Sequence, residues 1–133
     1  MCLDNELDAF IERLKTSEAL GDAKIIKAYP YVLKPTKLKN TVIAVSPSEI
    51  SAQSISLGQE NFFASYVIDA DIYVPVELGS PKIWEYIRGI LLSQMNSFPS
   101  SVSVSKVTAE DRLSCCTAKC SITYNGALDL ENI

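Results

Sequence analysis

Apolar side chains near the start of the chain recur at intervals of three and four residues. They are Leu3, Leu7, Phe10 and Leu14. An α-helix turns about once every 3.6 residues, so this spacing places them on one side of a helix. Acidic residues crowd the first turn, and Gly21 suits the end of a helix. The pattern predicts an amphipathic helix over about residues 4–20.

The longest regular pattern in the chain is an alternation between residues 62 and 74. The even positions carry Phe62, Ala64, Tyr66, Ile68, Ala70, Ile72 and Val74. Successive side chains of a β-strand point to opposite faces, so this pattern predicts one strand with one buried face. At about 3.3 Å per residue the strand spans roughly 40 Å. Most strands have only about 5 or 6 residues, so we expect this one to curl over the helices or to project beyond the core and meet another chain.

Extended segments are also predicted before this strand. Thr41–Val45 and Ile50–Leu57 are rich in apolar and β-branched residues, with a bend or bulge at Ser46–Ser48 between them. Gly58–Asn61 has the composition of a hairpin connection. Lys24–Leu33 is a weaker, β-prone stretch that Pro30 interrupts. Strands are therefore expected over about residues 41–75.

A second helix and a final hairpin complete the chain. Ser80 and Pro81 are typical of a helix start, and Pro99 cannot continue a helix, so we predict a helix over about 81–97. Its apolar stripe is Ile83, Ile87, Ile90, Leu91 and Met95. Alternating residues then predict a hairpin over about 101–125, with its turn at Thr108–Asp111.

The order of these elements predicts an α+β fold. We expect a curved antiparallel β-sheet of about four to five strands with two α-helices packed on one face. The chain of 133 residues has the length of a single domain, about 1–133.

Composition excludes several classes of function. The chain has no histidine, 12 basic and 16 acidic residues, and a net charge of −4. Imidazole bases and most zinc sites are thereby excluded, and no phosphate-binding loop or nucleophile motif is present. No apolar run has the ~20 residues of a membrane helix, and the first residues lack the pattern of a signal peptide. We expect a cytoplasmic protein that is not an enzyme, binds no cofactor or metal, and does not associate with a membrane.

Lysines gather between residues 24 and 39, at Lys24, Lys27, Lys34, Lys37 and Lys39. No arginine lies among them, and arginine supplies the two-pronged contacts that most nucleic-acid readers use. The overall charge of the chain is negative. We therefore expect a solvated or partner-facing loop here rather than direct binding of nucleic acid.

Cysteines and paired aspartates are the remaining candidates for chemistry. On a strand, Cys116 and Cys120 lie roughly 13 Å apart, too far to share a metal or form a disulfide, and Cys115 points the other way. We expect Cys116 and Cys120 to be small buried side chains. Asp69 and Asp71 share the other face of the long strand, about 7 Å apart. Without converging partners they are expected to be solvated or paired with a neighbouring chain.

One combination of segments resembles a known family. It comprises the first helix, Val42–Val45, the turn Ile55–Gly58, the strand Tyr66–Pro75 with its D-x-D-I-Y-V-P ending, and a helix that carries Trp84, followed by a hairpin. This order resembles the tail terminator, or tail-completion, proteins of tailed phages and prophages. The resemblance implies a ring, usually of six subunits, that caps the tail tube and joins it to the head connector. DNA at most passes through the pore of such a ring, and the protein passes from the cytoplasm into the virion or tail particle.

Self-association is the function that this interpretation requires. We predict the interface at the distal part of the long hairpin and at the lysine-rich loop, with the residues Lys34, Lys37, Lys39, Ser54, Ser56, Gln59 and Phe63. Two alternatives remain: another small neck or head-completion protein, or a cytosolic small-molecule binding domain that uses Tyr66, Tyr73 and Trp84.

Overall fold

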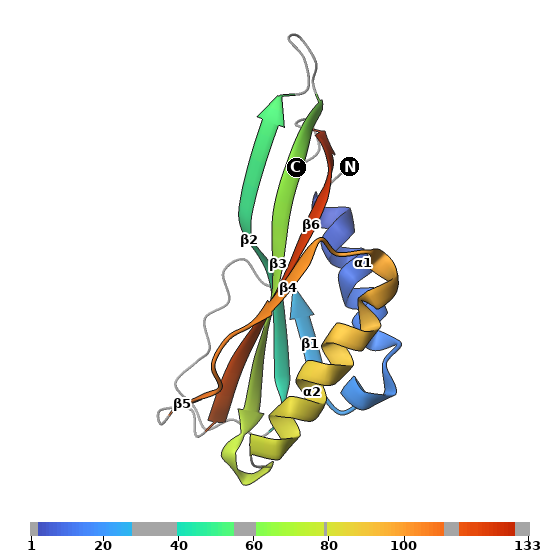
Figure 1. The fold of residues 1–133 in the computed structure, drawn as a ribbon. Helices are drawn as coiled ribbons and strands as arrows, with labels where there is room; N and C mark the ends of the chain where they lie inside the picture. The colour runs from blue at the N-terminus through green and yellow to red at the C-terminus, as the bar shows by residue number, and fades with distance from the viewer. Residues whose placement is uncertain (1–2, 28–39, 55–60, 79, 111–114, 130–133) are drawn as a thin grey trace.

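The computed structural model describes residues 3–27, 40–54, 61–78, 80–110 and 115–129, and Figure 1 shows how their elements are arranged. The helices are α1 (Leu3–Lys15) and α2 (Ser80–Ser93), with short 3-10 turns η1 (Glu18–Leu20), η2 (Val76–Leu78) and η3 (Met95–Ser97). The strands are β1 (Lys24–Lys27), β2 (Val42–Ser54), β3 (Asn61–Pro75), β4 (Ser101–Val104), β5 (Thr108–Glu110) and β6 (Cys115–Asp129). The predicted α+β class is confirmed.

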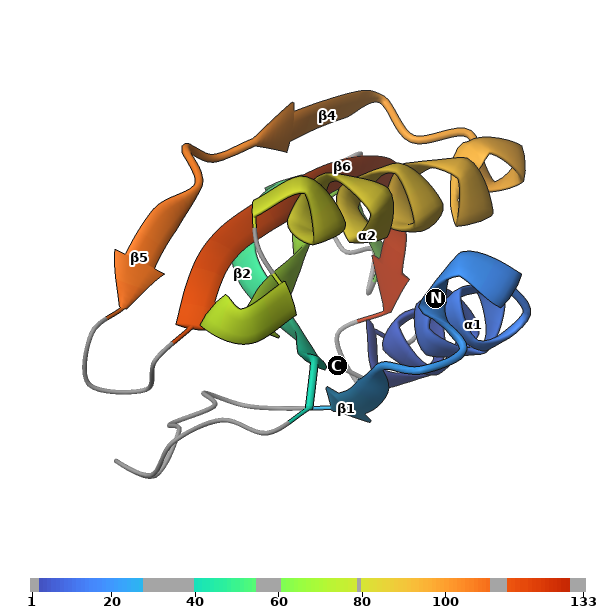
Figure 2. The ribbon, with the colours of Figure 1, turned by 90° about the horizontal axis from the view of Figure 1, so that it is seen from below.

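The strands form one open, mostly antiparallel sheet in the order β1-β2-β3-β6-β4, and β5 also pairs with β6. Six strands are described rather than the four to five predicted, because the segment predicted as the turn of the last hairpin begins with the short strand β5. β1 differs from the rest, since it runs parallel to β2. Figure 2 shows both helices on the same, concave side of the curved sheet.

The long alternating strand is β3, and its predicted burial is confirmed. From Tyr66 to Val74 every even residue is buried, and these residues face the helices. The partner strand β6 runs alongside it over its full length, with Tyr66 opposite Tyr124 and Ile72 opposite Ala118. The Tyr66 and Tyr124 rings stack with their centroids 5.6 Å apart. The upper ends of β2, β3 and β6 stand clear of both helices in Figure 1, so the strand both curves and projects.

β2 is a single strand, where two extended segments were predicted. The predicted interruption at Ser46–Ser48 is a β-bulge between Pro47 and Glu49, which shifts the register to β3 by one residue. A bulge bends a strand without ending it. Most of the predicted connection Gly58–Asn61 lies outside the described residues.

Both helices are shorter than predicted. α1 ends at Lys15 and the chain continues through η1, while α2 ends at Ser93 and continues through η3. Because a 3-10 turn has about three residues per turn, side chains after Ser93 leave the stripe of the α-helix. Met95, predicted in the buried stripe, is therefore exposed, and Gln94 is buried instead.

Gly89 lets α2 approach η1 closely. A Cβ added at Gly89 would lie 3.1 Å from Leu20 Cδ2 and 3.2 Å from the Cβ of Ala19. Both distances are shorter than ordinary van der Waals contact, and Leu20 is buried. The absent side chain thus offsets the cost of about 1 kcal/mol that glycine carries inside a helix.

Gln94 joins α1, the end of α2 and β6 in the buried layer. Its Nε2 donates to the backbone carbonyl of Phe10 at 3.2 Å. Its Oε1 accepts from Arg13 Nε at 2.6 Å and from the Tyr124 hydroxyl at 3.4 Å. One buried amide therefore fixes the positions of both helices against the sheet.

We expect Gln94→Leu to lower the free energy of unfolding by about 1–3 kcal/mol, because leucine fills a similar volume but makes none of these buried hydrogen bonds. Urea unfolding measures the change. Leu92→Ala, at an exposed position of α2, is the control and should stay within about 0.5 kcal/mol. A loss at Gln94 no larger than that of the control would contradict the role given to this amide.

Candidate functional site

The face of the sheet that points away from the helices is rich in hydroxyl groups. We call it the open face. Its residues on β2, β3 and β6 include Ser46, Ser51, Ser65, Asp69, Asp71, Thr117, Lys119, Ser121 and Thr123. On these three strands Lys119 is the only basic residue that the register places there. The open face is thus polar with little positive charge.

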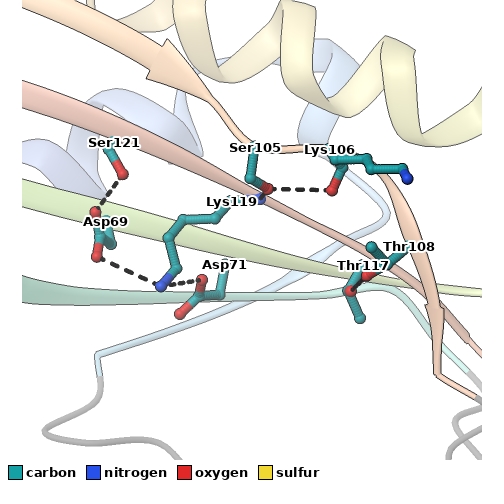
Figure 3. Close-up of polar contacts among 8 residues, drawn as sticks. All are labelled: Asp69, Asp71, Ser105, Lys106, Thr108, Thr117, Lys119 and Ser121. Atoms are coloured by element: carbon teal, nitrogen blue, oxygen red, sulfur yellow. Dashed lines mark hydrogen bonds and ion pairs between the residues drawn. The ribbon is translucent and has the colours of Figure 1, made fainter.

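Asp69, Asp71, Lys119 and Ser121 form a connected cluster at the centre of this face, shown in Figure 3. The Ser121 hydroxyl donates to Asp69 Oδ1 at 2.7 Å. Lys119 Nζ lies 3.9 Å from Asp69 Oδ2 and 3.9 Å from Asp71 Oδ1. Register explains the convergence, because Asp71 lies opposite Lys119 and Asp69 lies opposite Ser121 on the adjacent strand.

The structure corrects the expectation for these two aspartates. They were predicted to be solvated or paired with a neighbouring chain, but Asp69 is only 5% exposed and their cation comes from β6 of the same chain. The sequence spacing of 48 to 50 residues between the carboxylates and Lys119 concealed the pairing, which follows only once β3 and β6 are placed side by side.

This cluster sets one ammonium group against two carboxylates, so it stays net negative while both carboxylates are ionised. Burial raises the pKa of Asp71; the Lys119 ammonium lowers it, and the Asp69 carboxylate raises it again. No group of three or more histidine, cysteine, aspartate or glutamate side chains suited to a metal lies among the residues that the structure describes. Lys119 therefore offsets the charge of only one of the two carboxylates.

Hydroxyl contacts continue the open face onto β5 and the segment between β4 and β5. Thr108 Oγ1 and Thr117 Oγ1 are 2.8 Å apart. The backbone N–H of Lys119 donates to Ser105 Oγ at 2.8 Å, and the Ser105 hydroxyl donates to the Lys106 carbonyl at 3.3 Å. Figure 3 shows these contacts beside the cluster of Asp69, Asp71 and Lys119.

The cysteines on β6 are structural. Cys120 is fully buried, as predicted, and Cys116 is half-buried against the core. Cys115 is buried as well, although it was expected on the opposite face to Cys116. Burial, with a smaller contribution from Asp71, raises the pKa of Cys120 to about 12. A thiol with so high a pKa is a poor nucleophile at neutral pH.

A shallow groove of about 660 Å³ lies between η1 and α2. Its charged lining residues are Glu18, Asp22, Lys82, Glu85 and Arg88. Lys82 Nζ lies 3.3 Å from Glu85 Oε2, and the Tyr86 hydroxyl donates to Asp22 at 2.9 Å. Because acidic and basic groups are mixed along it, the groove favours neither sign of charge.

The structure places few of the predicted interface residues. Five of them lie outside the described residues: Lys34, Lys37, Lys39, Ser56 and Gln59. Ser54 ends β2 opposite Phe62, and Phe63 follows on β3 opposite Gln53. These two residues therefore lie on adjacent strands at the distal end of the hairpin.

The aromatic residues proposed for a small-molecule site are not brought together on one face. Tyr66 is buried on the helix side of β3, whereas Tyr73, seven residues later, lies on the open face. Trp84 is exposed on α2. An odd spacing along a strand places two side chains on opposite faces, so these three residues cannot line a single pocket.

Sequence reasoning missed a set of exposed apolar side chains at the end of α2 and along β4. They are Leu92, Met95, Phe98, Val102 and Val104. Phe98 is 88% exposed and has a left-handed backbone with φ of 54°. The alternation of valine and serine predicted a strand here, but it does not show that β4 lies at the border of the sheet.

Comparison with known proteins adds no relative to this description. No protein-family model matches the chain, and no curated protein matches its sequence. Within the described ranges, no helix is long and apolar enough to cross a lipid bilayer. The open face, the edges of the sheet and the exposed apolar residues are the features on which a functional proposal rests.

We predict a pH-dependent effect of Asp71→Asn. The raised pKa of Asp71 means that its contribution to stability is full below the pKa of the unfolded state, about 3.9, and is lost as the pH rises through the folded pKa. Asparagine has no such loss. The free energy of unfolding of Asp71→Asn should therefore rise relative to that of the unmodified protein between acid and neutral pH.

Urea unfolding at a series of pH values measures this difference. Glu49→Gln is the control, since it removes an exposed carboxylate from the same face. Curves for Asp71→Asn and the unmodified protein that stay parallel at all pH values would refute the prediction.

Phe98→Asn should stabilise the protein by about 1 kcal/mol, because a left-handed backbone costs most residues about 1–2 kcal/mol and asparagine tolerates it. Phe98→Ala removes the same exposed ring but keeps the backbone cost, so it should leave the free energy of unfolding nearly unchanged. Urea unfolding of both variants compares them directly. Equal stabilities of the two variants would show that the backbone of Phe98 stores no strain.

Proposed function

We propose that this protein is a structural component of virion assembly, a tail terminator that forms a ring on the end of a phage or prophage tail tube and joins it to the head connector. The observation that carries the proposal is the long three-stranded ribbon of β2, β3 and β6, which extends past both helices. Strands of 13 and 15 residues exceed what two short helices can cover. Such a ribbon suits a protein that acts by joining to copies of itself.

The polar open face supports the same proposal. The two helices cover one face of the sheet, so in a ring the other face is free to line the channel. Its serine and threonine hydroxyls are uncharged, and Lys119 already lies between Asp69 and Asp71. Proteins bind DNA mainly by placing positively charged lysine and arginine side chains against its negatively charged phosphates. A lining with little free positive charge lets DNA pass without holding it.

The genes beside this one provide a first test. Genes for tube, sheath or tape-measure proteins are expected in the same cluster. A neighbourhood made up only of metabolic genes would count against the proposal and favour a small-molecule function at a site other than Tyr66, Tyr73 and Trp84.

The mass of the purified protein in solution is the decisive measurement. Light scattering and native mass spectrometry should give one closed assembly, six times the subunit mass of 14.6 kDa, and electron microscopy should show a central channel. Reversal of charge at Lys37 and Lys39, or Ser56→Pro, should leave a folded monomer. Lys15→Glu, an exposed reversal on α1, is the control and should leave the ring intact. A protein that stays monomeric at every concentration would refute the proposal.

A further inference from the structure

We infer that the outer edge of β4 in one copy pairs with the outer edge of β2, beyond β1, in the next copy. The joint is antiparallel and made by backbone hydrogen bonds. This inference rests on the proposed ring and specifies which parts of the sheet close it. It is carried by the direction in which the backbone groups of both edge strands point.

The phase of the backbone on β2 follows from one hydrogen bond. The N–H of Lys24 in β1 donates to the carbonyl of Thr41 at 2.9 Å. The backbone N–H and carbonyl groups of Thr41, and of every second residue after it up to the bulge, therefore point toward β1 and the outer edge. The backbone groups of Ser46 therefore point toward β3, where Ser46 lies opposite Asp69. The backbone groups of Val67, two residues from Asp69, point toward β2 as well, and the partner of Val67 after the bulge is Glu49. The next residue, Ile50, turns its N–H and carbonyl outward.

On β4, at the other border of the sheet, the backbone groups also alternate between the adjacent strand and the outer edge. The N–H of Ser105 donates to the carbonyl of Lys119 at 2.9 Å, so Ser103, two residues earlier, also faces β6. The backbone groups of Val102 and Val104 therefore point outward. In the described part of the sheet β4 has no strand beyond it, and β1 covers β2 only over Val42–Val45.

The side chains at these outward positions match. Ile50 lies opposite Tyr66, Val102 opposite Ile122 and Val104 opposite Cys120, so all three side chains lie on the helix side of the sheet. They are 42%, 45% and 36% exposed, respectively. Pairing of the two edges would bring apolar side chains together on one face, as neighbouring strands do inside a sheet.

Strand directions select the partner edge. β2, β3, β6 and β4 alternate in direction, because each neighbouring pair is antiparallel, so β4 runs opposite to β2. A rotation about an axis along the strands keeps these directions in every copy. β4 of one copy then meets β2 of the next in antiparallel orientation, with the helices on the same side. A head-to-tail contact of this kind closes into a ring when its rotation divides the circle.

Pro47 and the bulge confine the joint to the distal part of β2. By the same alternation Pro47 faces the outer edge, where its missing N–H cannot donate to a neighbour. The available stretch is therefore Glu49–Ser54. Val102 is level with Ile122, Ile68 and Pro47, so the joint steps along the strands by about three residues, roughly 10 Å. Closed sheets of tilted strands have such a stagger.

Two proline substitutions test the joint. Val104→Pro removes an outward N–H from β4, and Ile50→Pro does the same on β2, in each case without removing a bond to the adjacent strand. Each variant alone should be folded by circular dichroism and have the subunit mass in light scattering. Mixed in equal amounts, the two should form a dimer and nothing larger, because only one intact pair of edges remains.

Control variants separate backbone from side-chain effects. Val104→Thr keeps the N–H and a β-branched side chain, so it should keep the ring. The double variant Val102→Lys and Val104→Lys leaves the backbone free but places charge at the joint. It should also be monomeric, and it serves if a proline variant does not fold.

The outcomes distinguish this inference from the proposed function. If folded proline variants still form the ring, the inference is wrong and the ring stands on another interface. If Ile50→Pro alone forms a dimer, the β4 edges pair with each other and the head-to-tail joint is wrong. If the unmodified protein never assembles, the proposed function and the inference both fail.

Discussion

The two-residue period of β3 is the constraint on which the rest of the structure depends. In a pleated strand the side chains alternate between the two faces, and the backbone N–H and carbonyl groups alternate between the two edges. The face on which one residue lies therefore determines the faces and edges of all the others. In β3 the even residues pack under the helices and the odd residues lie on the open face. A slip of one residue would expose Ile68 and Ile72 and bury Asp69 and Asp71 beneath the helices. Because each strand is paired in register with the next from β1 to β4, the alternation in β3 also determines which backbone groups point outward at the two edges of the sheet.

The two helices cover one face of the sheet and leave the other face uncovered. α1 and α2 cover the same side, where Gln94 connects Phe10, Arg13 and Tyr124. Lys27 in β1 also pairs with Asp4 and Asp8 of α1, which ties the border strand to the helix layer. The opposite side carries hydroxyl groups and the carboxylates of Asp69 and Asp71, whose charge Lys119 offsets in part. In the proposed ring, this difference between the faces would let copies join edge to edge while a polar surface stays free.

The period of apolar residues predicted the class of fold, the long strand and both helices, because these depend on local repetition. It could not predict how far Asp69 is buried or that Lys119 lies between Asp69 and Asp71, because these depend on which strands become neighbours across some 50 residues of chain. The exposure of Val102 and Val104 was missed for the same reason: alternation gives the face on which a side chain lies but not whether another element covers that face. The ends of the helices were misplaced where 3-10 turns replaced the α-helical period. Local pattern thus sufficed for elements and faces, and long-range pairing decided the site.

The two borders of the sheet differ in a way that bears on control of assembly. Natural sheets protect exposed edges with proline, bulges, charge or short strands, since an open edge recruits any other strand. β2 has Pro47 and a bulge beside the region that β1 covers, and within the described residues only its distal part has no neighbour on that edge. β4 has no proline or charge within Ser101–Val104, but it has only four residues. Each edge alone offers few hydrogen bonds, so neither holds an unrelated strand firmly. In the proposed ring all joints would form together, and this would favour the complete assembly over open chains of subunits.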